Sequence, residues 1–471
     1  MKKRSIPTFL VACVLLTGCA TKPSSSASVH STVSQKPVDT KPVTTKPVDT
    51  KPVDTKPNPT PKIPDYSLGV PEPKDIHGIY VSAYAVSDPA VFQNLLHLVD
   101  TTSLNTMVID MKIDNGDITF ATNNPELKPY SKSLIKNPQK LMATLKAHHI
   151  YPIARIAVFE DTLYADAHPE DSFLLNGKPW IGRQGQAYTN PFLPNVWKYN
   201  VDVAKAVAKL GFEQIQFDFV RFPSALASMQ GTIQYQMGSF QNQTPTEIQA
   251  TNETYQQNLK VYQNKLASLQ AKETAIQSNN STDSGSELQT IQTAIADLQK
   301  KKPIAPHFTT AEKLGDLRVN AVTDFVKYAY AQLKPYHVKT AVDIFGYTAT
   351  IPESTSVGQS YPSIAQNVDV MSPMIYPSLW GSGYFGLAHP DLNPYQTVVG
   401  FMQAEQKIMS GVKHKPELIP WIQDYTATFL GAGNYQTYTK TQVDEQIQAL
   451  AKYGVNSYLI WNPSNVYSPG I

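Results

Sequence analysis

Residues 213–223 read EQIQFDFVRFP, a stretch in which apolar and polar side chains alternate before an arginine and a proline. Alternation with a period of two predicts a β-strand, with the apolar residues from Ile215 to Phe219 on one face and Asp218 on the other. Burying an unpaired carboxylate is costly, so such a residue is usually paired with a cation or held for chemistry. Asp218 is therefore a candidate for either role.

The chain repeats a strand-then-helix unit eight times from Gly78 onward. The eight strand-like runs are GIYVSAYAV (from Gly78), NTMVIDMKID (from Asn105), IYPIARIAVF (from Ile150), EQIQFDFVRF (from Glu213), VKTAVDIFGY (from Val338), VDVMSPMIYPS (from Val368), ELIPWIQDY (from Glu417) and VNSYLIWNPS (from Val455). Helix-like segments lie between them, such as residues 89–101, 138–148, 195–210, 311–333 and 440–453. Eight such units predict an α/β fold, a (β/α)₈ TIM barrel over residues 74–471, rather than a doubly wound sheet.

Polar and aromatic side chains occur near the carboxyl ends of several predicted strands, where barrels of this kind build their active sites. Alternation along the second strand places Asp110, Lys112 and Asp114 on one face. The same alternation turns Asp218 and Asp343 toward the inside of the barrel. We therefore expect one rim to carry these candidate substrate contacts: Asp110, Lys112, Arg155, Arg221, Tyr376, Trp421, Gln423, Asp424, Trp461 and Asn462.

Asp218 and Asp343 are the candidate catalytic pair. Asp218 would act as the nucleophile, or as the base in an inverting enzyme, and Asp343 as the general acid. A general acid needs a raised pKa so that it still holds its proton at the working pH. The alternative for Asp218 is a structural ion pair with Arg155 or Arg221.

Other assignments of these side chains stay open. Glu160 and Asp161, at the end of the third strand, are the second choice for an acid/base pair. Asp110 and Lys112 could form an internal salt bridge instead of contacting a substrate. The two strand-end tryptophans could pack in the core rather than stack on sugar rings.

The chain resembles the "putative glycosyl hydrolase domain" family of bacteria through eight motifs, which are GIYVSAY, VIDMKIDNG, YPIARIAVFED, EQIQFDFVRFP, DIFGY, VMSPMIYPS, PWIQDY and LIWNPSN, in this order. The resemblance covers about residues 78–223 and 308–464. It implies membership of the TIM-barrel glycosidase clan. By similarity to α-amylase-type barrels, it also implies that Asp218 is the nucleophile and that a neighbouring strand supplies the acid/base.

The leading functional prediction is hydrolysis or transfer of O-glycosidic bonds in a polysaccharide or peptidoglycan-type glycan outside the cytoplasmic membrane. The alternative is a non-catalytic carbohydrate-binding barrel. A second carboxylate about 5 Å from Asp218 favours a retaining enzyme, a separation of about 6.5–9.5 Å an inverting one, and no partner a binding module. A polysaccharide deacetylase is a distant third possibility, because it would want a metal-binding His and Asp set.

Several chemistries find no support in the composition or the motifs. Charged residues make up 17% of the chain and the net charge is +2, so nucleic acid is not an expected partner. The sequence has no GxSxG, HExxH or P-loop motif, and both cysteines lie in the first 20 residues. We therefore expect no metal and no cofactor, and we expect a monomer.

The N-terminus is typical of an exported lipoprotein. Residues 1–19 combine a basic start, an apolar run and the sequence LTGC, which predicts a signal peptide whose last residue, Cys19, is lipidated. An ordinary secretory signal is the alternative. Residues 20–73 are rich in Ser, Lys and Pro and contain KPVDT-type repeats, which predict a disordered tether. The sequence thus predicts an extracytoplasmic domain anchored to the cell membrane by lipid.

Residues 224–306 interrupt the barrel pattern after the fourth strand. Two apolar seams with spacings of three and four residues run through Leu259–Leu269 and Leu288–Leu298, with the turn-like NNSTDSGS between them. This pattern predicts an antiparallel helical hairpin of the coiled-coil kind over about residues 247–302, placed beside the active-site rim.

Overall fold

The structure, a computed structural model, describes residues 63–183, 185–278 and 285–471. In this part of the chain, eight parallel strands close into a barrel, because each strand pairs with its neighbours in sequence order and the last pairs with the first. The strands are β1 (His77–Val81), β2 (Thr106–Lys112), β5 (Tyr151–Ala157), β8 (Gln214–Asp218), β9 (Lys339–Phe345), β10 (Val370–Met374), β12 (Trp421–Gln423) and β13 (Tyr458–Trp461). Each overlaps one predicted strand, so the predicted (β/α)₈ barrel is confirmed.

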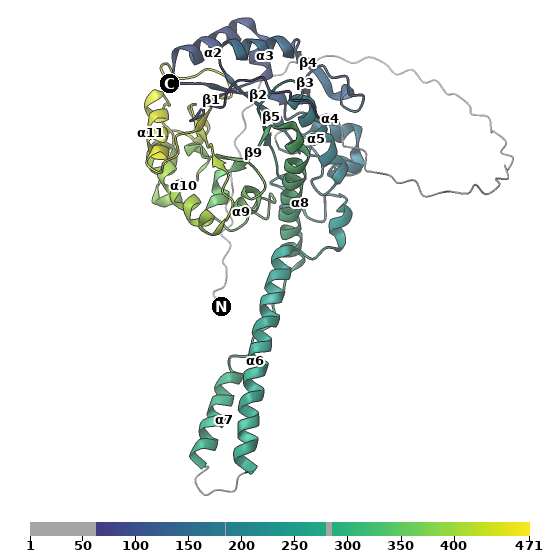
Figure 1. The fold of residues 1–471 in the computed structure, drawn as a ribbon, viewed down its shortest axis with the longest axis vertical. Coiled ribbons are helices and arrows are strands. Elements are labelled where there is room, and N and C mark those ends of the chain that lie inside the picture. Colours follow the sequence, from purple (N-terminus) through teal and green to yellow (C-terminus); the bar gives the residue numbers. More distant parts are fainter. Residues whose placement is uncertain (1–62, 184, 279–284) are drawn as a thin grey trace, which may run out of the picture. The chain divides into compact units, whose positions relative to one another are not determined.

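Helices surround the strands and cover their outer faces (Figure 1). They are α2 (Pro89–Thr101), α3 (Pro138–Ala147), α5 (Pro194–Ala208), α8 (Thr310–Leu333), α9 (Tyr361–Ala365), α10 (Pro394–Ile408) and α11 (Lys440–Ala451). The shorter elements are α1 (Ala83–Ser87), α4 (Thr162–Ala167), β3 (Ile118–Phe120), β4 (Ser131–Ile135), β6 (Leu174–Leu175), β7 (Lys178–Pro179) and β11 (Glu417–Leu418). Helix α10 was not among the segments that the sequence singled out.

Local sequence explains where several helices begin. Asp88 accepts hydrogen bonds from the first amides of α2, and a proline at the first helical position removes an amide that would lack a partner. Helices α8 and α11 begin with capping boxes, formed by Thr309 with Glu312 and by Thr439 with Gln442. These contacts satisfy backbone donors that the helices themselves leave free.

Alternate residues of each strand contribute to two separate apolar layers. Outward residues, such as Ile215 and Phe217 of β8, pack against the helices. Inward residues, such as Val108 of β2, Ile153 of β5 and Ala341 of β9, fill the barrel interior. A polar residue at an inward position therefore lies in the interior of the barrel or at its mouth.

The insertion after β8 contains two long helices, α6 (Thr246–Ser278) and α7 (Gly285–Gln299), which lie side by side (Figure 1). Most of their side chains are exposed, and Ile248 is the one buried residue in the described parts of both helices. The half-buried residues of the seam include Leu259, Leu266 and Leu298. A narrow apolar seam between two otherwise polar helices accounts for this hairpin.

The folded unit begins earlier than the predicted boundary at residue 74. Ser67 Oγ and the Gly69 amide donate hydrogen bonds to Glu213 Oε1, and Val70 is buried. The predicted signal peptide, Cys19 and the repeats lie outside the described residues. Within the described residues, no helix is both long enough and apolar enough to cross a membrane.

Candidate active site

Arg155 joins three neighbouring strands at the inside of the barrel. From β5, its Nε and Nη2 atoms lie 2.9 and 2.5 Å from Asp218 Oδ2 on β8, and its Nη1 lies 2.7 Å from Asp110 Oδ1 on β2. Tyr80 of β1 donates its hydroxyl to the other Asp110 oxygen at 2.6 Å. Burial raises the pKa of Asp110, while Arg155 and Tyr80 act in the opposite direction. One buried guanidinium thus compensates two carboxylates.

Asp218 and Asp343 lie next to each other on adjacent strands. Strands β8 and β9 pair with Phe217 opposite Val342, so the next residues, Asp218 and Asp343, occupy the same row. Asp218 is 9% exposed, whereas Asp343 is 2% exposed. Burial and the negative charge of Asp218 raise the pKa of Asp343 well above its usual value. This environment favours the protonated form of the Asp343 carboxyl group.

An aromatic wall lies beside the Arg155 guanidinium. Trp461, at the end of β13, is half-buried, with its ring centre 4.2 Å from that of Tyr80 and 6.3 Å from that of Tyr376. The Arg155 guanidinium carbon lies 5.7 Å from the centre of the Trp461 ring. A half-buried aromatic ring beside carboxylates is suited to stacking on the apolar face of a sugar ring.

Phe219 does not lie on the outward face of its strand, as alternation predicted. Strand β8 ends at Asp218, and Phe219 has a φ of 53°, in the left-handed region. The Phe219 amide donates to Asp218 Oδ1 at 2.6 Å. The ring centre lies 5.9 Å from the guanidinium carbon of Arg155 and 5.1 Å from that of Arg221. Phe219 is therefore part of the site and not of the helix-facing core.

Glu160 forms a second buried acidic group at the end of β5. It accepts a hydrogen bond from the Tyr188 hydroxyl, and Arg221 Nη2 lies 3.6 Å from its Oε2. Burial raises the pKa of Glu160 to about 7, although Arg221 and Tyr188 lower it. The charge of Asp218 also contributes to the increase, which places the two carboxylates in the same electrostatic environment. Glu160 therefore remains a candidate acid/base.

The raised pKa of Glu160 predicts a pH-dependent stability. Between the usual value of 4.5 and about 7, the folded protein holds a proton that the unfolded chain releases. The contribution of Glu160 to the free energy of unfolding should therefore fall as the pH rises through this window and stay level above it. In Glu160→Gln this fall should be about 2 kcal/mol smaller, as measured by urea unfolding at pH 5 and pH 7.5. An equal fall in both proteins would contradict the assignment.

The sequence match to a known family extends over almost all of this architecture. A family described as "Putative glycosyl hydrolase domain" matches residues 78–467. The chain belongs to this family. The description of the family agrees with a barrel that carries carboxylates at the carboxyl ends of its strands. No curated protein matches the chain.

Several solved structures are similar to this glycosyl hydrolase domain. A hypothetical protein from Ruminiclostridium thermocellum ATCC 27405 is 26% identical, with 34% of this chain and 83% of that chain covered and a TM-score of 0.31. The PgaB (BpsB) glycoside hydrolase domain from Bordetella bronchiseptica is 14% identical, with coverages of 83% and 95% and a TM-score of 0.49. The spore cortex-lytic enzyme SleL from Bacillus megaterium QM B1551 is 10% identical, with coverages of 85% and 73% and a TM-score of 0.38.

Lys112 is not part of the rim of the glycosyl hydrolase domain, contrary to the prediction. The register between β2 and β5 shifts after Asp110, so Lys112 lies opposite the outward residue Ile156. Such a bulge turns the following side chain to the other face of the strand. Lys112 is fully buried and forms an ion pair of 2.8 Å with Asp161. Neither residue joins the Asp218 cluster, which consists of Asp110, Arg155, Asp218 and Asp343.

Gln423, Asp424 and Asn462 serve the loops around the site rather than its carboxylates. Gln423 Nε2 donates to Asp391 Oδ1 at 3.0 Å. Asp424 accepts hydrogen bonds from the amide and the hydroxyl of Ser468, and Asn462 donates to the Asp424 carbonyl. These buried groups are paired with loop residues and support the loops at the mouth of the barrel.

Two residues of the site were missed at the level of sequence. Tyr80 shares the inward face of β1, and alternation from Gly78 could have identified it. Tyr188 reaches Glu160 from the long segment between β5 and α5, through an isolated bridge between the two residues. No periodicity in the sequence marks such a contact.

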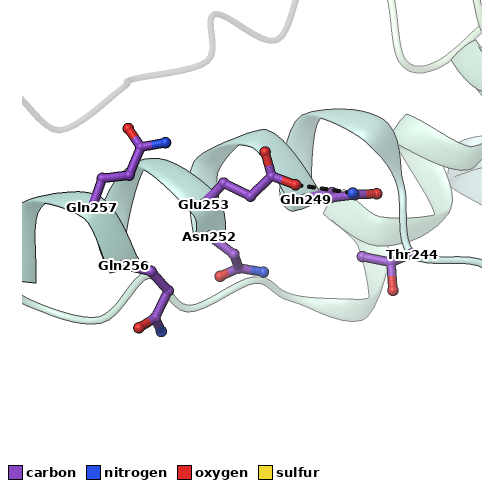
Figure 2. Close-up of a pocket in the computed structure, with 6 residues that line it drawn as sticks. All are labelled: Thr244, Gln249, Asn252, Glu253, Gln256 and Gln257. Atoms are coloured by element: carbon purple, nitrogen blue, oxygen red, sulfur yellow. Dashed lines mark hydrogen bonds between the residues drawn. The ribbon is translucent and has the colours of Figure 1, made fainter. Parts of the chain in front are cut away.

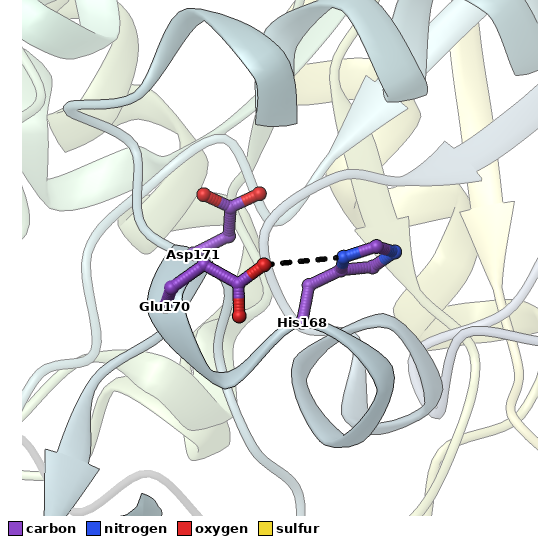
Figure 3. Close-up of side chains that lie close together, drawn as sticks. All are labelled: His168, Glu170 and Asp171. Carbon is purple, nitrogen blue, oxygen red and sulfur yellow. Dashed lines mark ion pairs between the residues drawn. The ribbon is translucent and has the colours of Figure 1, made fainter. Parts of the chain in front are cut away.

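Two further polar features lie outside the Asp218 cluster, namely a hollow and a group of potential metal ligands. A hollow beside the start of α6 is lined by Thr244, Gln249, Asn252, Glu253, Gln256 and Gln257 (Figure 2). It offers one carboxylate, which accepts a hydrogen bond from Gln249. His168, Glu170 and Asp171 bring potential metal ligands within 4.8 Å of one another (Figure 3). However, the buried Asp171 already accepts hydrogen bonds from Tyr164 and Asn195.

Proposed function

We propose that the domain hydrolyses O-glycosidic bonds in a polysaccharide or cell-wall glycan, with Asp218 as nucleophile and Asp343 as general acid. The observation that carries this proposal is the shared row of the two carboxylates on adjacent strands. Neighbouring strands are about 4.7–4.9 Å apart, and the carboxyl groups of retaining glycosidases are about 5–5.5 Å apart. Two carboxylates in one row of adjacent strands can reach that separation, so we propose a retaining, two-step reaction.

In the first step, an Asp218 oxygen attacks the anomeric carbon while Asp343 gives its proton to the leaving oxygen. The products are a glycosyl ester on Asp218 and a free sugar hydroxyl. In the second step, the Asp343 carboxylate takes a proton from a water molecule, which attacks the same carbon and releases Asp218. Arg155 compensates the charge of Asp218 before the first step and after the second.

The half-buried Trp461 supports a sugar ring as the substrate group. Its position above Arg155 and beside Tyr80 and Tyr376 places an aromatic face next to the reacting carboxylates. Indole rings stack on the apolar face of a sugar, and the surrounding charged groups bind its hydroxyls. Arg221, whose Nη2 lies 3.6 Å from Glu160 Oε2, is the residue that orients Glu160.

We also propose that the protein acts outside the cytoplasmic membrane, held there by a lipid on Cys19. The support comes from the sequence of residues 1–19 and from the repeats that follow. A tether rich in proline would hold the domain away from the bilayer, within reach of cell-wall glycans.

The proposal is tested by incubating the full chain with a panel of soluble and insoluble glycans, including peptidoglycan, and measuring new reducing ends. We expect cleavage of at least one glycan, with a first product that keeps the anomeric configuration of the substrate, as followed by proton NMR. A product with the opposite configuration would contradict the retaining assignment. Binding of a glycan without cleavage would favour a carbohydrate-binding barrel instead.

A further inference from the structure

Two buried donors bind the same oxygen of Asp343. Trp421 Nε1 lies 2.6 Å from Asp343 Oδ1, and Gln216 Nε2 lies 2.7 Å from the same atom. Trp421 is 1% exposed and Gln216 is fully buried, so no solvent competes for these contacts. Both side chains occupy inward positions, Trp421 on β12 and Gln216 on β8.

The two donors occupy Asp343 Oδ1, so a proton on this carboxyl group has to lie on Oδ2. An indole N–H can only donate a hydrogen bond. The amide of Gln216 is oriented by Gln214, whose Nε2 donates to Gln216 Oε1 at 3.3 Å, so that the Gln216 N–H group faces Asp343. An oxygen that accepts two N–H groups in this way offers no site for a further hydrogen.

We propose that Trp421 and Gln216 are positioning residues that make Asp343 carry its proton on Oδ2. In the reaction proposed above, on which the acid role rests, Oδ2 is then the oxygen that faces the leaving group. Trp421 was a candidate for sugar stacking from the sequence, but its ring is buried edge-on against Trp461, at 5.6 Å between centres. Trp461 therefore provides the ring that would stack on the sugar, and Trp421 contacts both Trp461 and the acid, Asp343.

The same donors make proton release possible. Burial and Asp218 raise the pKa of Asp343, whereas the hydrogen bonds from Trp421 and Gln216 lower it, because they stabilise the carboxylate. Without them, a carboxyl group in this place would hold its proton too strongly to protonate a leaving oxygen effectively. The two donors thus fix both the position of the proton and the ease of its transfer.

NMR of the tryptophan indole N–H groups tests this proposal without a substrate. The full chain has 5 tryptophans, and Trp421→Phe should remove one indole peak and so assign it. In the native protein we expect this peak to move with pH as Asp343 ionises. The movement should vanish in Asp343→Asn, and its midpoint should lie at higher pH in Gln216→Leu, which lacks one donor.

Trp380→Phe is the matched control, since the Trp380 indole nitrogen is also buried but has no hydrogen-bond partner among the described residues. The Trp421 titration should be unchanged in this variant. A Trp421 peak that does not respond to pH, or that titrates identically in Asp343→Asn, would overturn the proposal.

The indole measurement contains no glycan, so its failure and the failure of the hydrolase proposal are distinguishable. If a glycan is cleaved, Trp421→Phe should also move the basic limb of the pH profile of kcat/KM to higher pH, because one donor to the carboxylate is lost. A uniform loss of rate with an unmoved limb would show that Trp421 has only a packing role.

Discussion

Asp218→Asn is expected to lower kcat on a cleaved glycan by on the order of 10⁴-fold or more, since the amide cannot form the glycosyl ester. Asparagine has the same shape as aspartate, and its side-chain oxygen can still accept the hydrogen bonds that Arg155 now gives to Asp218 Oδ2, whereas its amide nitrogen cannot accept the one that the Phe219 amide gives to Oδ1. The Arg155 charge stays paired with Asp110. The variant should therefore fold with a modestly lowered melting temperature, because one hydrogen bond is lost, and still bind the glycan. Steady-state kinetics, thermal unfolding and a binding assay measure these three properties.

Asp391→Asn is a suitable control for this variant. Asp391 is a buried carboxylate as well, but its partners are Gln423 and the Gln436 amide, outside the Asp218 cluster. We expect its turnover to match that of the native protein. If Asp218→Asn cleaves the glycan at the native rate, Asp218 is a structural partner of Arg155 and the proposed mechanism fails.

Lys112→Met should lower the free energy of unfolding by about 3–5 kcal/mol, because it removes one charge of a buried ion pair and leaves the other charge uncompensated. Lys112 lies 2.8 Å from Asp161 Oδ2 and also donates to the Ala157 carbonyl at 2.6 Å. Methionine fills a similar volume but makes none of these contacts. Chemical denaturation at neutral pH measures the loss.

A double variant separates the charge from the packing. Lys112→Met with Asp161→Asn removes both charges, while the asparagine oxygen can still accept from the Tyr164 amide at the start of α4. We expect it to recover more than half of the lost stability. Lys440→Met removes a lysine that also pairs with an aspartate, but the side chains of Lys440 and Asp444 are 46% and 39% exposed, so the change should cost about 0–1 kcal/mol. Equal losses in the two lysine variants would contradict the buried-pair interpretation.

Alternation along the strands was sufficient to predict much of the barrel and its central pair. It placed Asp110, Asp218 and Asp343 inside, because each belongs to a regular strand whose outward neighbours are apolar. The number and order of the eight strands then fixed the architecture. These features depend on local patterns that each segment carries in its own sequence.

Alternation failed where the backbone departs from a regular strand. A bulge after Asp110 turns Lys112 outward, and a left-handed residue directly after β8 turns Phe219 toward the arginines. Neither position carries a glycine or a proline that would have predicted the change in the backbone. Alternation could not identify the partner of Gln423 for a different reason. Gln423 donates a hydrogen bond to Asp391, which lies in a loop distant in sequence. Only the assembled structure shows which polar groups already have partners.

The helical hairpin has a consequence for how the chain finds its fold. Asp218 and Asp343 are separated by 125 positions, and the hairpin, residues 246–299, accounts for nearly half of them. The entropy of closing a loop grows only with the logarithm of its length, so an insertion that roughly doubles the loop costs about 0.6 kcal/mol. A hairpin that forms early shortens the effective loop again. The strand pairing that unites the two carboxylates can therefore tolerate a long insert at this position, including a reporter domain fused between α6 and α7.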